Sequence, residues 1–236
     1  MKTILEICRE VADLAAVQRP TDLFASEDLN SQIWLSVAKS ELESLLRYGN
    51  WQELTKEAQF LTACGQSNYR IDDFVPDFYC LLPNTIYIKD SSERVIGAIT
   101  PEQWTREKMF NCPSLDIKFK IQNNVIRFLN PPQCYKFIFQ YRSNGIVWDH
   151  NTFTEKSALT DNNDVPIFDE YLVKLGILWR WLKRTGLDYT EEYNEYEKEL
   201  KKRFGESLAT RDINLAGPVL DDCAEVANVI VYKSCQ

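Results

Sequence analysis

Two adjacent helical patterns between Ile167 and Phe204 constrain the fold more than any other feature of the chain. In the first pattern, apolar side chains recur every three or four residues and form one stripe, at Leu172, Leu175, Trp179 and Leu182. Further apolar side chains widen this stripe, at Val173, Ile177 and Trp181. A helix that is apolar over so much of its circumference is usually buried on several sides. We therefore expect this helix to lie inside a core.

The second helix is expected to follow after a very short turn. Gly186 suits the residue that ends the first helix, and Asp188 with Glu191 has the spacing of a capping box for the second. The second helix carries a single stripe, at Tyr189, Tyr193, Tyr196, Leu200 and Phe204. Its other face carries pairs of opposite charge four residues apart, Glu197–Lys201 and Glu199–Arg203. These patterns predict an antiparallel αα-hairpin whose tyrosines are more typical of core packing than of a stacking surface.

Two more helices are expected near the N-terminus, over residues 3–15 and 28–48. Thr3 and Glu6 have capping-box spacing at the start of the first helix. Asp28 suits the positive N-terminal end of the second helix, and Gly49 suits the residue just beyond its end. One face of the second helix is apolar, at Trp34, Ala38, Leu42 and Leu45.

Short strands predominate between residues 51 and 155. Residues 53–63 and 69–71 are interpreted as a β-hairpin with Gly65 in its turn. Further strands are separated by polar turns such as Asn123–Asn124, and they are expected within residues 84–90, 93–98, 116–122, 124–130 and 135–142.

One short helix is expected inside this strand-rich region. Thr100 has the position of its N-cap, Pro101 is the first helical residue, and Gln103 completes a capping box. Trp104 and Met109 are expected to pin this helix to the sheet.

The order of these patterns predicts an α+β fold. We expect a helical bundle formed by the N- and C-terminal helices, with a β-rich insertion that contains one short helix, plus an extended C-terminal tail. The expected divisions are N-terminal helices over residues 1–50, the β-rich insertion over 51–155, the C-terminal helical hairpin over 156–205 and the C-terminal extension over 206–236.

The charge balance argues against a protein whose main task is to grip nucleic acid. The formal net charge is −8 and the isoelectric point is near 4.9, whereas such proteins are usually basic. An acidic chain could still surround a duplex loosely, because an acidic wall repels phosphate and lets the duplex slide. No run approaches the roughly 18 apolar residues that a membrane span requires.

The cysteines predict free thiols in a reducing cytosol. Their count of seven is odd, and no two of them have the close C-x-x-C spacing that zinc knuckles and redox motifs need.

A catalytic constellation is absent from the sequence. His150 is the one histidine, and it has neither a second histidine for a metal site nor a G-x-S-x-G serine to activate. Residues Asp161–Val165 ("DNNDV") resemble part of a calcium loop, but the glycine and the glutamate that such a loop needs are missing, so a solvated loop or a lead-in to a helix is expected. We therefore expect a protein that is not an enzyme and that has no cofactor or metal.

The order of several segments resembles the head-to-tail adaptor (connector) proteins of tailed double-stranded-DNA phages. The resemblance runs from the first helix to about Gly205. The segments that carry it are "ICREVADLAAVQRP", "RYGNWQELTKEAQF", "IDDFVPD", "TPEQWTREK", "FKIQNNVIRFLNPP", "FIFQYRSNGIVW" and, above all, "FDEYLVKLGILWRWLKRTGLDY".

The resemblance implies a structural role in a virion, in the neck between capsid and tail, after assembly in the host cytoplasm. Such adaptors form a homo-oligomeric ring, commonly of twelve copies, on the portal protein, and they present a surface to the next neck or tail protein. DNA passes through the channel of the ring without tight binding. The alternatives are another neck or tail ring protein, such as a stopper or tail-tube component, and a DNA-binding packaging factor.

Two groups of residues are candidates for contacts. The first is a basic cluster that could contact DNA or a neighbouring subunit, or could form a solvated helix face paired with glutamates, at Lys198, Lys201, Lys202 and Arg203. The second is an extended apolar segment that could add a strand to a partner's sheet, or could pair within its own domain, at Val219, Val226, Val229, Ile230, Val231 and Tyr232.

Overall fold

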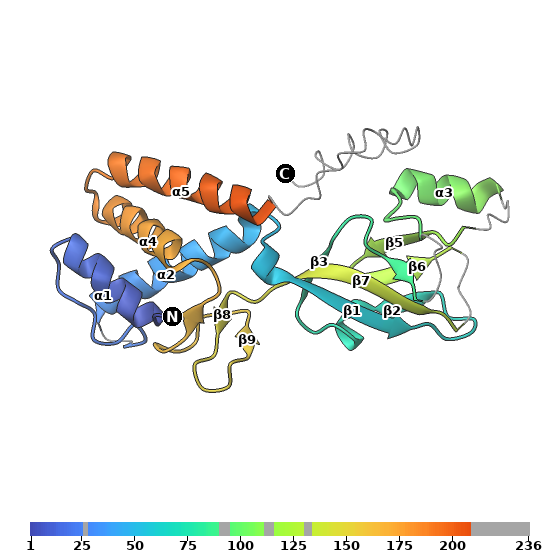
Figure 1. Ribbon diagram of the computed structural model, residues 1–236, viewed down its shortest axis with the longest axis horizontal. Helices are drawn as coiled ribbons and strands as arrows, with labels where there is room; N and C mark the ends of the chain where they lie inside the picture. The colour runs from blue at the N-terminus through green and yellow to red at the C-terminus, as the bar shows by residue number, and fades with distance from the viewer. Residues whose placement is uncertain (26–27, 90–94, 111–115, 130–133, 209–236) are drawn as a thin grey trace.

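Two separate hydrophobic cores divide the chain into two lobes, which lie end to end in Figure 1. The computed structural model describes residues 1–25, 28–89, 95–110, 116–129 and 134–208. The helical lobe is built around one core by α1 (Ile4–Leu14), α2 (Leu29–Tyr48), α4 (Glu170–Thr185) and α5 (Thr190–Leu208). The β lobe is built around the other core, and two stretches of chain connect the lobes.

The caps of the first two helices form as their sequences predict. At the start of α1, the Glu6 N–H donates to Thr3 Oγ1 at 3.3 Å, and the Thr3 N–H donates to Glu6 Oε2 at 2.9 Å. At the start of α2, the Asp28 carboxylate accepts from the N–H groups of Asn30 and Ser31. These bonds satisfy N–H groups that have no partner within the helix.

Helix α4 lies at the centre of the helical lobe, in contact with α1, α2 and α5. The side chains of its wide apolar stripe are buried, which confirms the prediction from the sequence. Trp181 of α4 stacks on Trp34 of α2, with ring centroids 5.3 Å apart. Gly176 lies directly against the carboxylate of Glu41, which leaves no room for a side chain at that position.

The turn between α4 and α5 confirms the predicted αα-hairpin. Gly186 has the left-handed conformation (φ 78°) that a helix end of this type requires. The Leu187 N–H donates to the Leu182 carbonyl at 3.0 Å, and the Asp188 carboxylate accepts from the Thr190 N–H at 3.1 Å. Helix α5 continues past Gly205 to Leu208, although its apolar pattern ends earlier.

In its described residues, the β lobe contains two antiparallel sheets and one α-helix, α3 (Pro101–Phe110). In the first sheet the strands have the order β1 (Thr55–Leu61), β7 (Lys136–Ser143) and β3 (Phe78–Leu81), and β4 (Tyr87–Ile88) also pairs with β7. In the second sheet the order is β2 (Asn68–Arg70), β6 (Val125–Phe128) and β5 (Phe119–Gln122). Phe137, Phe139 and Ile126 are buried in the core that these sheets share.

The expected hairpin around Gly65 is wrong. Strand β1 pairs with β7 along its whole length, from Thr55 opposite Arg142 to Leu61 opposite Lys136, while β2 pairs with β6. Alternation of apolar residues indicates a strand but does not choose its partner, and the long strand β7 lies beside three others.

Two other turns and caps of the β lobe confirm local predictions. Asn123 and Asn124 both have positive φ (53° and 55°) in the two-residue turn between β5 and β6, where asparagine is favoured. The capping box of Thr100 and Gln103 forms at the start of α3. Trp104 is buried as expected, but Met109 is 78% exposed and does not pin the helix.

A third antiparallel sheet adjoins the helical lobe and was not expected there. It has the order β10 (Val165–Pro166), β8 (Val147–Trp148) and β9 (Glu155–Lys156). The loop before β10, which we expected to be solvated or to lead into a helix, contacts α1: the Ile4 N–H donates to the Asp164 carbonyl at 2.9 Å. Asp164 is 1% exposed, and its carboxylate pairs with Lys156 at 2.7 Å.

The predicted fold class is therefore wrong. The described residues form a mixed α/β fold with five α-helices and ten strands in three antiparallel sheets, which is richer in strands than a bundle of the terminal helices. The terminal helices do not enclose their core alone, because strand and loop side chains complete it: Ile146, Val147, Leu159 and Phe168. Strands as short as β9 and β10 lack the alternation that would reveal them in a sequence.

The contact between Gly176 and Glu41 generates a first prediction. Gly176→Ala should lower the free energy of unfolding by about 1–3 kcal/mol, because a methyl group would push α2 and α4 apart. Gly205→Ala is the control, because Gly205 lies in α5 with no atom near the position of the added methyl group. That variant should equal the wild type or gain up to about 1 kcal/mol from helix propensity. Urea denaturation measures both, and equal stability of Gly176→Ala and the wild type would contradict the packing.

The loop between β8 and β9 generates a second prediction, on pH. Lys156 and the N–H groups of Thr152 and Asn151 bind Asp149 and hold its pKa well below the usual range. A carboxyl whose pKa is lower in the folded state stabilises the fold above its unfolded pKa, near 3.9, and loses this effect as the pH falls. Asp149→Asn should therefore be less stable than the wild type at pH 7, and the difference should shrink between about pH 5 and 2. Thermal unfolding across that range measures the difference, and a constant difference would contradict the assignment.

Candidate functional site

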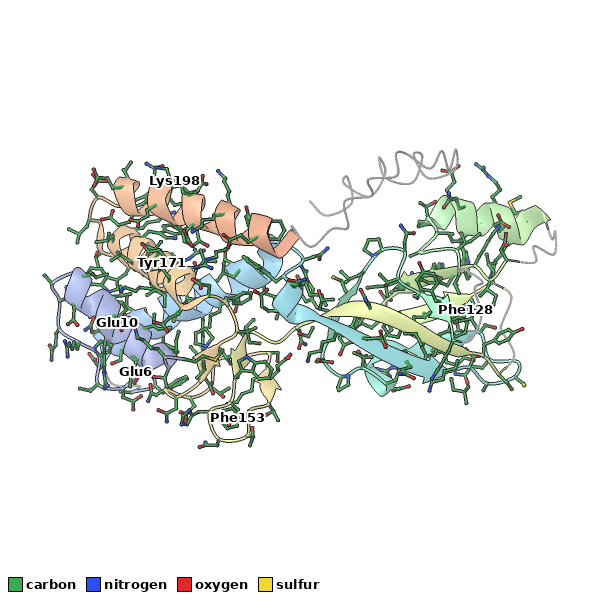
Figure 2. The ribbon with its side chains drawn as sticks, viewed as in Figure 1. Glu6, Glu10, Phe128, Phe153, Tyr171 and Lys198 are labelled. Carbon is green, nitrogen blue, oxygen red and sulfur yellow. The ribbon has the colours of Figure 1, made fainter. Side chains whose placement is uncertain are left out.

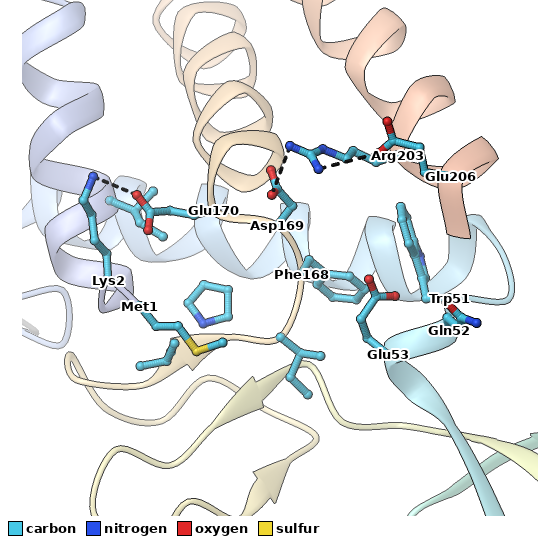
Figure 3. Close-up of a pocket in the computed structure, with 14 residues that line it drawn as sticks. Met1, Lys2, Trp51, Gln52, Glu53, Phe168, Asp169, Glu170, Arg203 and Glu206 are labelled. Carbon is cyan, nitrogen blue, oxygen red and sulfur yellow. Dashed lines mark ion pairs between the residues drawn. The ribbon is translucent and has the colours of Figure 1, made fainter. Parts of the chain in front are cut away.

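A groove of about 450 Å³ lies in the helical lobe, beside the chain that leads toward the β lobe (Figure 3). Segments that are far apart in the sequence line it. They are the N-terminal residues, the 3₁₀ turn η1 (Gln52–Leu54), β10 with the residues after it, the start of α4 and the end of α5. Its volume is in the range of ligand sites.

Aromatic side chains form one wall of the groove. Trp51 packs against Phe168 with ring centroids 5.6 Å apart, and against Phe204 with centroids 5.4 Å apart. The Trp51 indole N–H donates to the Leu45 carbonyl at 2.7 Å, which fixes the ring at the end of α2. Phe204 lies directly against Gly49, so a larger residue at that position would displace the ring.

Charged side chains form the rim. Asp169 caps α4 by accepting from the N–H groups of Tyr171 and Leu172 at 3.1 Å, and its second oxygen lies 3.4 Å from Arg203. Arg203 also lies 3.6 Å from Glu206. Figure 3 shows these pairs on one side of the groove and the 2.7 Å pair of Lys2 with Glu170 on the other.

The ion pairs favour the charged forms of the two rim cations, Lys2 and Arg203. Hydrogen bonds with Glu10 and Glu170 raise the pKa of Lys2. A hydrogen bond with Glu199, together with the charge of Asp169, raises the pKa of Arg203.

The chemistry of the groove suits recognition of a polypeptide. Its lining contains four carboxylates, from Glu53, Asp169, Glu170 and Glu206, against the side-chain cations of Lys2 and Arg203. No histidine, cysteine or serine lines it, so the lining offers no pair of nucleophile and base. An apolar wall inside a rim with excess negative charge is complementary to a segment that carries apolar and basic side chains.

The predicted basic cluster is divided between two surfaces. Lys201 lies 3.0 Å from Glu197, as predicted, and Lys202 lies 3.7 Å from Glu199. Arg203 pairs with Glu199 at 2.8 Å, as predicted, and it also reaches the rim of the groove. Lys198 is exposed on α5 and points away from the lobe in Figure 2. A contact of this cluster with DNA or with another subunit stays a prediction.

A second polar cluster lies where the lobes meet. Lys56 of β1 pairs at 2.7 Å with both Asp77 and Glu155, and the Tyr141 hydroxyl donates to Asp77 at 2.9 Å. Partial burial raises the pKa of Asp77, but the bonds with Lys56 and Tyr141 outweigh it and the pKa is lowered. Since Glu155 belongs to the third sheet and the other three residues to the β lobe, this cluster connects the two parts of the molecule.

Arg142 makes a further contact between the lobes. Its guanidinium donates to the Gly49 carbonyl and, at 3.2 Å, to the Asn50 side chain, both at the end of α2. The same guanidinium lies over the ring of Tyr79, 4.4 Å from its centroid. Arg142 is 6% exposed, so these contacts are shielded from water and position the lobes rather than an external ligand.

The remaining candidates from the sequence are His150 and the predicted partner-binding segment. His150 is exposed in the turn after β8. Within the described ranges, no group of three or more histidine, cysteine, aspartate or glutamate side chains is placed to hold a metal, and no helix is long and apolar enough to cross a membrane. The predicted partner-binding residues between Val219 and Tyr232 lie outside the described residues.

The groove and the cluster between the lobes were both missed in the sequence. Each gathers side chains from segments 20–200 residues apart, and periodicity gives no distance between such segments. One signal was present: Trp51 and Phe168 flank the ends of helical patterns, where an aromatic side chain commonly packs against a neighbouring element.

Comparisons with known proteins identify no family for this chain. No protein-family model matches the chain, and no curated protein is significantly similar to it. The resemblance to phage adaptors therefore stays a prediction that is based on the order of the quoted segments.

The double role of Asp169 generates a third prediction. Asp169→Ala removes the cap of α4 and the partner of Arg203, and it should lower the free energy of unfolding by about 1 kcal/mol. Asp169→Ser keeps a capping oxygen and removes only the partly exposed ion pair, so it should lie within about 0.5 kcal/mol of the wild type. Urea denaturation measures both variants. Equal losses of unfolding free energy in Asp169→Ala and Asp169→Ser would contradict a stabilising role for the cap.

Proposed function

We propose that the chain is a non-enzymatic head–tail adaptor of a tailed double-stranded-DNA phage. In this role it forms a ring on the portal protein, extends the DNA channel and contacts the next neck or tail protein. The observation that carries the proposal is the ordered set of segments that resemble such adaptors, from the first helix to about Gly205.

The positions of these segments in the fold support the proposal. The segment "RYGNWQELTKEAQF" runs from the end of α2 through η1 into β1, and "FIFQYRSNGIVW" runs back from β7 to β8. Both connections between the lobes therefore belong to the resemblance. The segment that carries it most strongly forms α4 and the turn to α5, at the centre of the helical lobe. The resemblance thus involves the residues that connect the two lobes and those that form the centre of the helical lobe.

The surface chemistry also suits a ring protein. The groove offers an apolar wall and an acidic rim to a neighbouring polypeptide, and it contains no nucleophile and base that would suggest catalysis. The net charge of −8 suits a channel through which DNA passes without tight binding, because like charges repel.

The proposal is tested by mixing the purified chain with the portal protein of the same virus. Mass photometry and negative-stain microscopy should detect a ring on the portal whose added mass corresponds to about twelve copies. A monomer in the absence of portal is compatible with the proposal, because a ring can form on its partner alone. No added mass on the portal would overturn it, and binding only to a tail tube or to another neck ring would favour the alternative ring role.

The groove generates a fourth prediction. Glu53→Lys reverses a charge on the exposed rim and should weaken ring formation on the portal by about tenfold, since a like charge opposed to a basic segment costs on the order of 1 kcal/mol or more. Glu43→Lys is the matched control, because Glu43 is exposed on α2 and does not line the groove. Titration followed by mass photometry measures both, and equal weakening would exclude the groove as the contact.

The packaging-factor alternative has a separate test. If the basic cluster of Lys198, Lys201, Lys202 and Arg203 binds phosphate, the chain should shift duplex DNA at low salt, and replacing its three lysines by alanine should abolish the shift. The adaptor proposal expects no shift with either protein.

A further inference from the structure

Two exposed cysteines that are 70 residues apart in the sequence meet at the end of the β lobe. Cys64 lies in the turn that follows β1, and Cys134 lies two residues before β7 begins. Their Sγ atoms are 3.0 Å apart, and both residues are exposed. Neither takes part in the groove or in the cluster between the lobes.

The backbone on both sides holds this pair together. Beyond the last register pair of β1 and β7, the Thr62 N–H donates to the Tyr135 carbonyl at 2.9 Å, and the Tyr135 N–H donates to Thr62 Oγ1 at 3.0 Å. Thr62 is 1% exposed, so these bonds are shielded from water. Cys64 lies two residues after Thr62, and Cys134 lies one residue before Tyr135. Both cysteines therefore lie just beyond the end of a β-ladder that these bonds fix.

The turn that carries Cys64 is fixed by a buried tyrosine. The Tyr69 hydroxyl accepts from the Ala63 N–H at 2.9 Å and lies 3.0 Å from the Gln66 carbonyl, to which it can donate. Gly65 has a left-handed conformation (φ 80°), which lets the chain turn without strain. On the other side, Cys134 also has positive φ (57°), which a residue other than glycine keeps only where its surroundings determine it.

The sulfur atoms need to approach by only about 1 Å to form a bond, because a disulfide has an S–S distance of about 2.05 Å. Hydrogen bonding to Cys64 and the charge on its sulfur raise the pKa of Cys134. Cys64 is exposed, so its thiolate is accessible to a reagent in solution.

We propose that Cys64 and Cys134 form a dithiol modification site that reacts with small disulfides, such as oxidised glutathione, to give an intrachain disulfide. The Cys64 thiolate attacks one sulfur of the glutathione disulfide, forms a mixed disulfide and releases one glutathione thiolate. Cys134 then gives up its proton, and its thiolate attacks the Cys64 sulfur and displaces the second glutathione. Two protein thiols are oxidised, one glutathione disulfide is reduced to two thiols, and the two protons pass from the cysteines to glutathione.

The bond would close a loop that contains β2 to β6 and α3, and it would tie the start of β7 to the turn after β1. It would therefore stabilise the β lobe. Under the proposed function, the chain passes from the reducing host cytoplasm to an oxidising medium, where disulfides persist. Only the moment at which the disulfide would form rests on the proposed function. The reaction itself is tested on the isolated full chain, so its failure and the failure of the adaptor proposal are distinguishable.

The test uses oxidised glutathione, intact-mass measurement and peptide mapping under non-reducing conditions. The wild type should yield a cross-linked peptide that joins Cys64 to Cys134, two hydrogen atoms lighter than the two reduced peptides together and without glutathione on either cysteine. Cys134→Ser should instead accumulate a stable glutathione adduct at Cys64, because the thiol that resolves the mixed disulfide is absent. Cys80→Ser is the control, since Cys80 is partly buried in β3, and it should behave as the wild type.

Two results would overturn the proposal. One is a wild-type chain that accumulates glutathione adducts at Cys64 or Cys134 without the cross-link. The other is a cross-link that joins a different pair of cysteines.

Stabilisation of the lobe is measured separately: the Tm of the oxidised wild type should exceed that of its reduced form by roughly 5–10 °C, while Cys64→Ser should show no difference. An unchanged Tm of the cross-linked protein would refute the stabilising role.

Discussion

The contact between Gly176 and Glu41 is the constraint on which the helical lobe depends. It lets α2 approach α4 so closely that the Glu41 carboxylate lies against the backbone of α4, 2.6 Å from Arg180. Glu41 is fully buried, and this burial raises its pKa while Arg180 opposes the shift. A buried ion pair contributes little net stability because both charges lose their hydration, but breaking it leaves one charge unpaired. An arrangement that separates Glu41 from Arg180 is therefore disfavoured, because it would leave a buried charge unpaired.

The position of α4 determines the groove and, through it, the connection to the β lobe. Phe168 and Asp169, which precede α4, contribute an aromatic wall and a charged rim, and Arg203 of α5 reaches the same rim. Trp51 packs on Phe168 and immediately precedes the chain that becomes β1. Lys56 of β1 then pairs with Asp77 and Glu155 between the lobes. The same few aromatic and charged contacts thus connect the core of one lobe to the first strand of the other.

Local features of this structure could be predicted from the sequence because neighbouring residues determine them. The capping box of Thr3, the left-handed Gly186 and the turn at Asn123–Asn124 depend on residues within a few positions. The apolar stripe of α4 identified the buried helix, because a helix brings every third or fourth residue to one face.

Features that depend on distant residues could not be predicted in this way. The alternation in β1 does not reveal that β7, rather than β2, is its partner. Asp164 was expected in a solvated loop or a lead-in to a helix, and its burial depends on α1 and Lys156, which its own segment does not contain. The groove, the third sheet and the close approach of Cys64 to Cys134 could not be predicted for the same reason, because each depends on residues that are distant in the sequence. The fold class was wrong for this reason, since strands of two residues are defined by their partners rather than by their own pattern.

The most direct test of the adaptor role is a cryo-EM reconstruction of the neck of the virus that encodes this chain. The account predicts a ring below the portal in which each subunit fits the two lobes, with the groove of the helical lobe in contact with a neighbouring polypeptide. A neck ring built from other polypeptides, in a particle that lacks this chain, would contradict it.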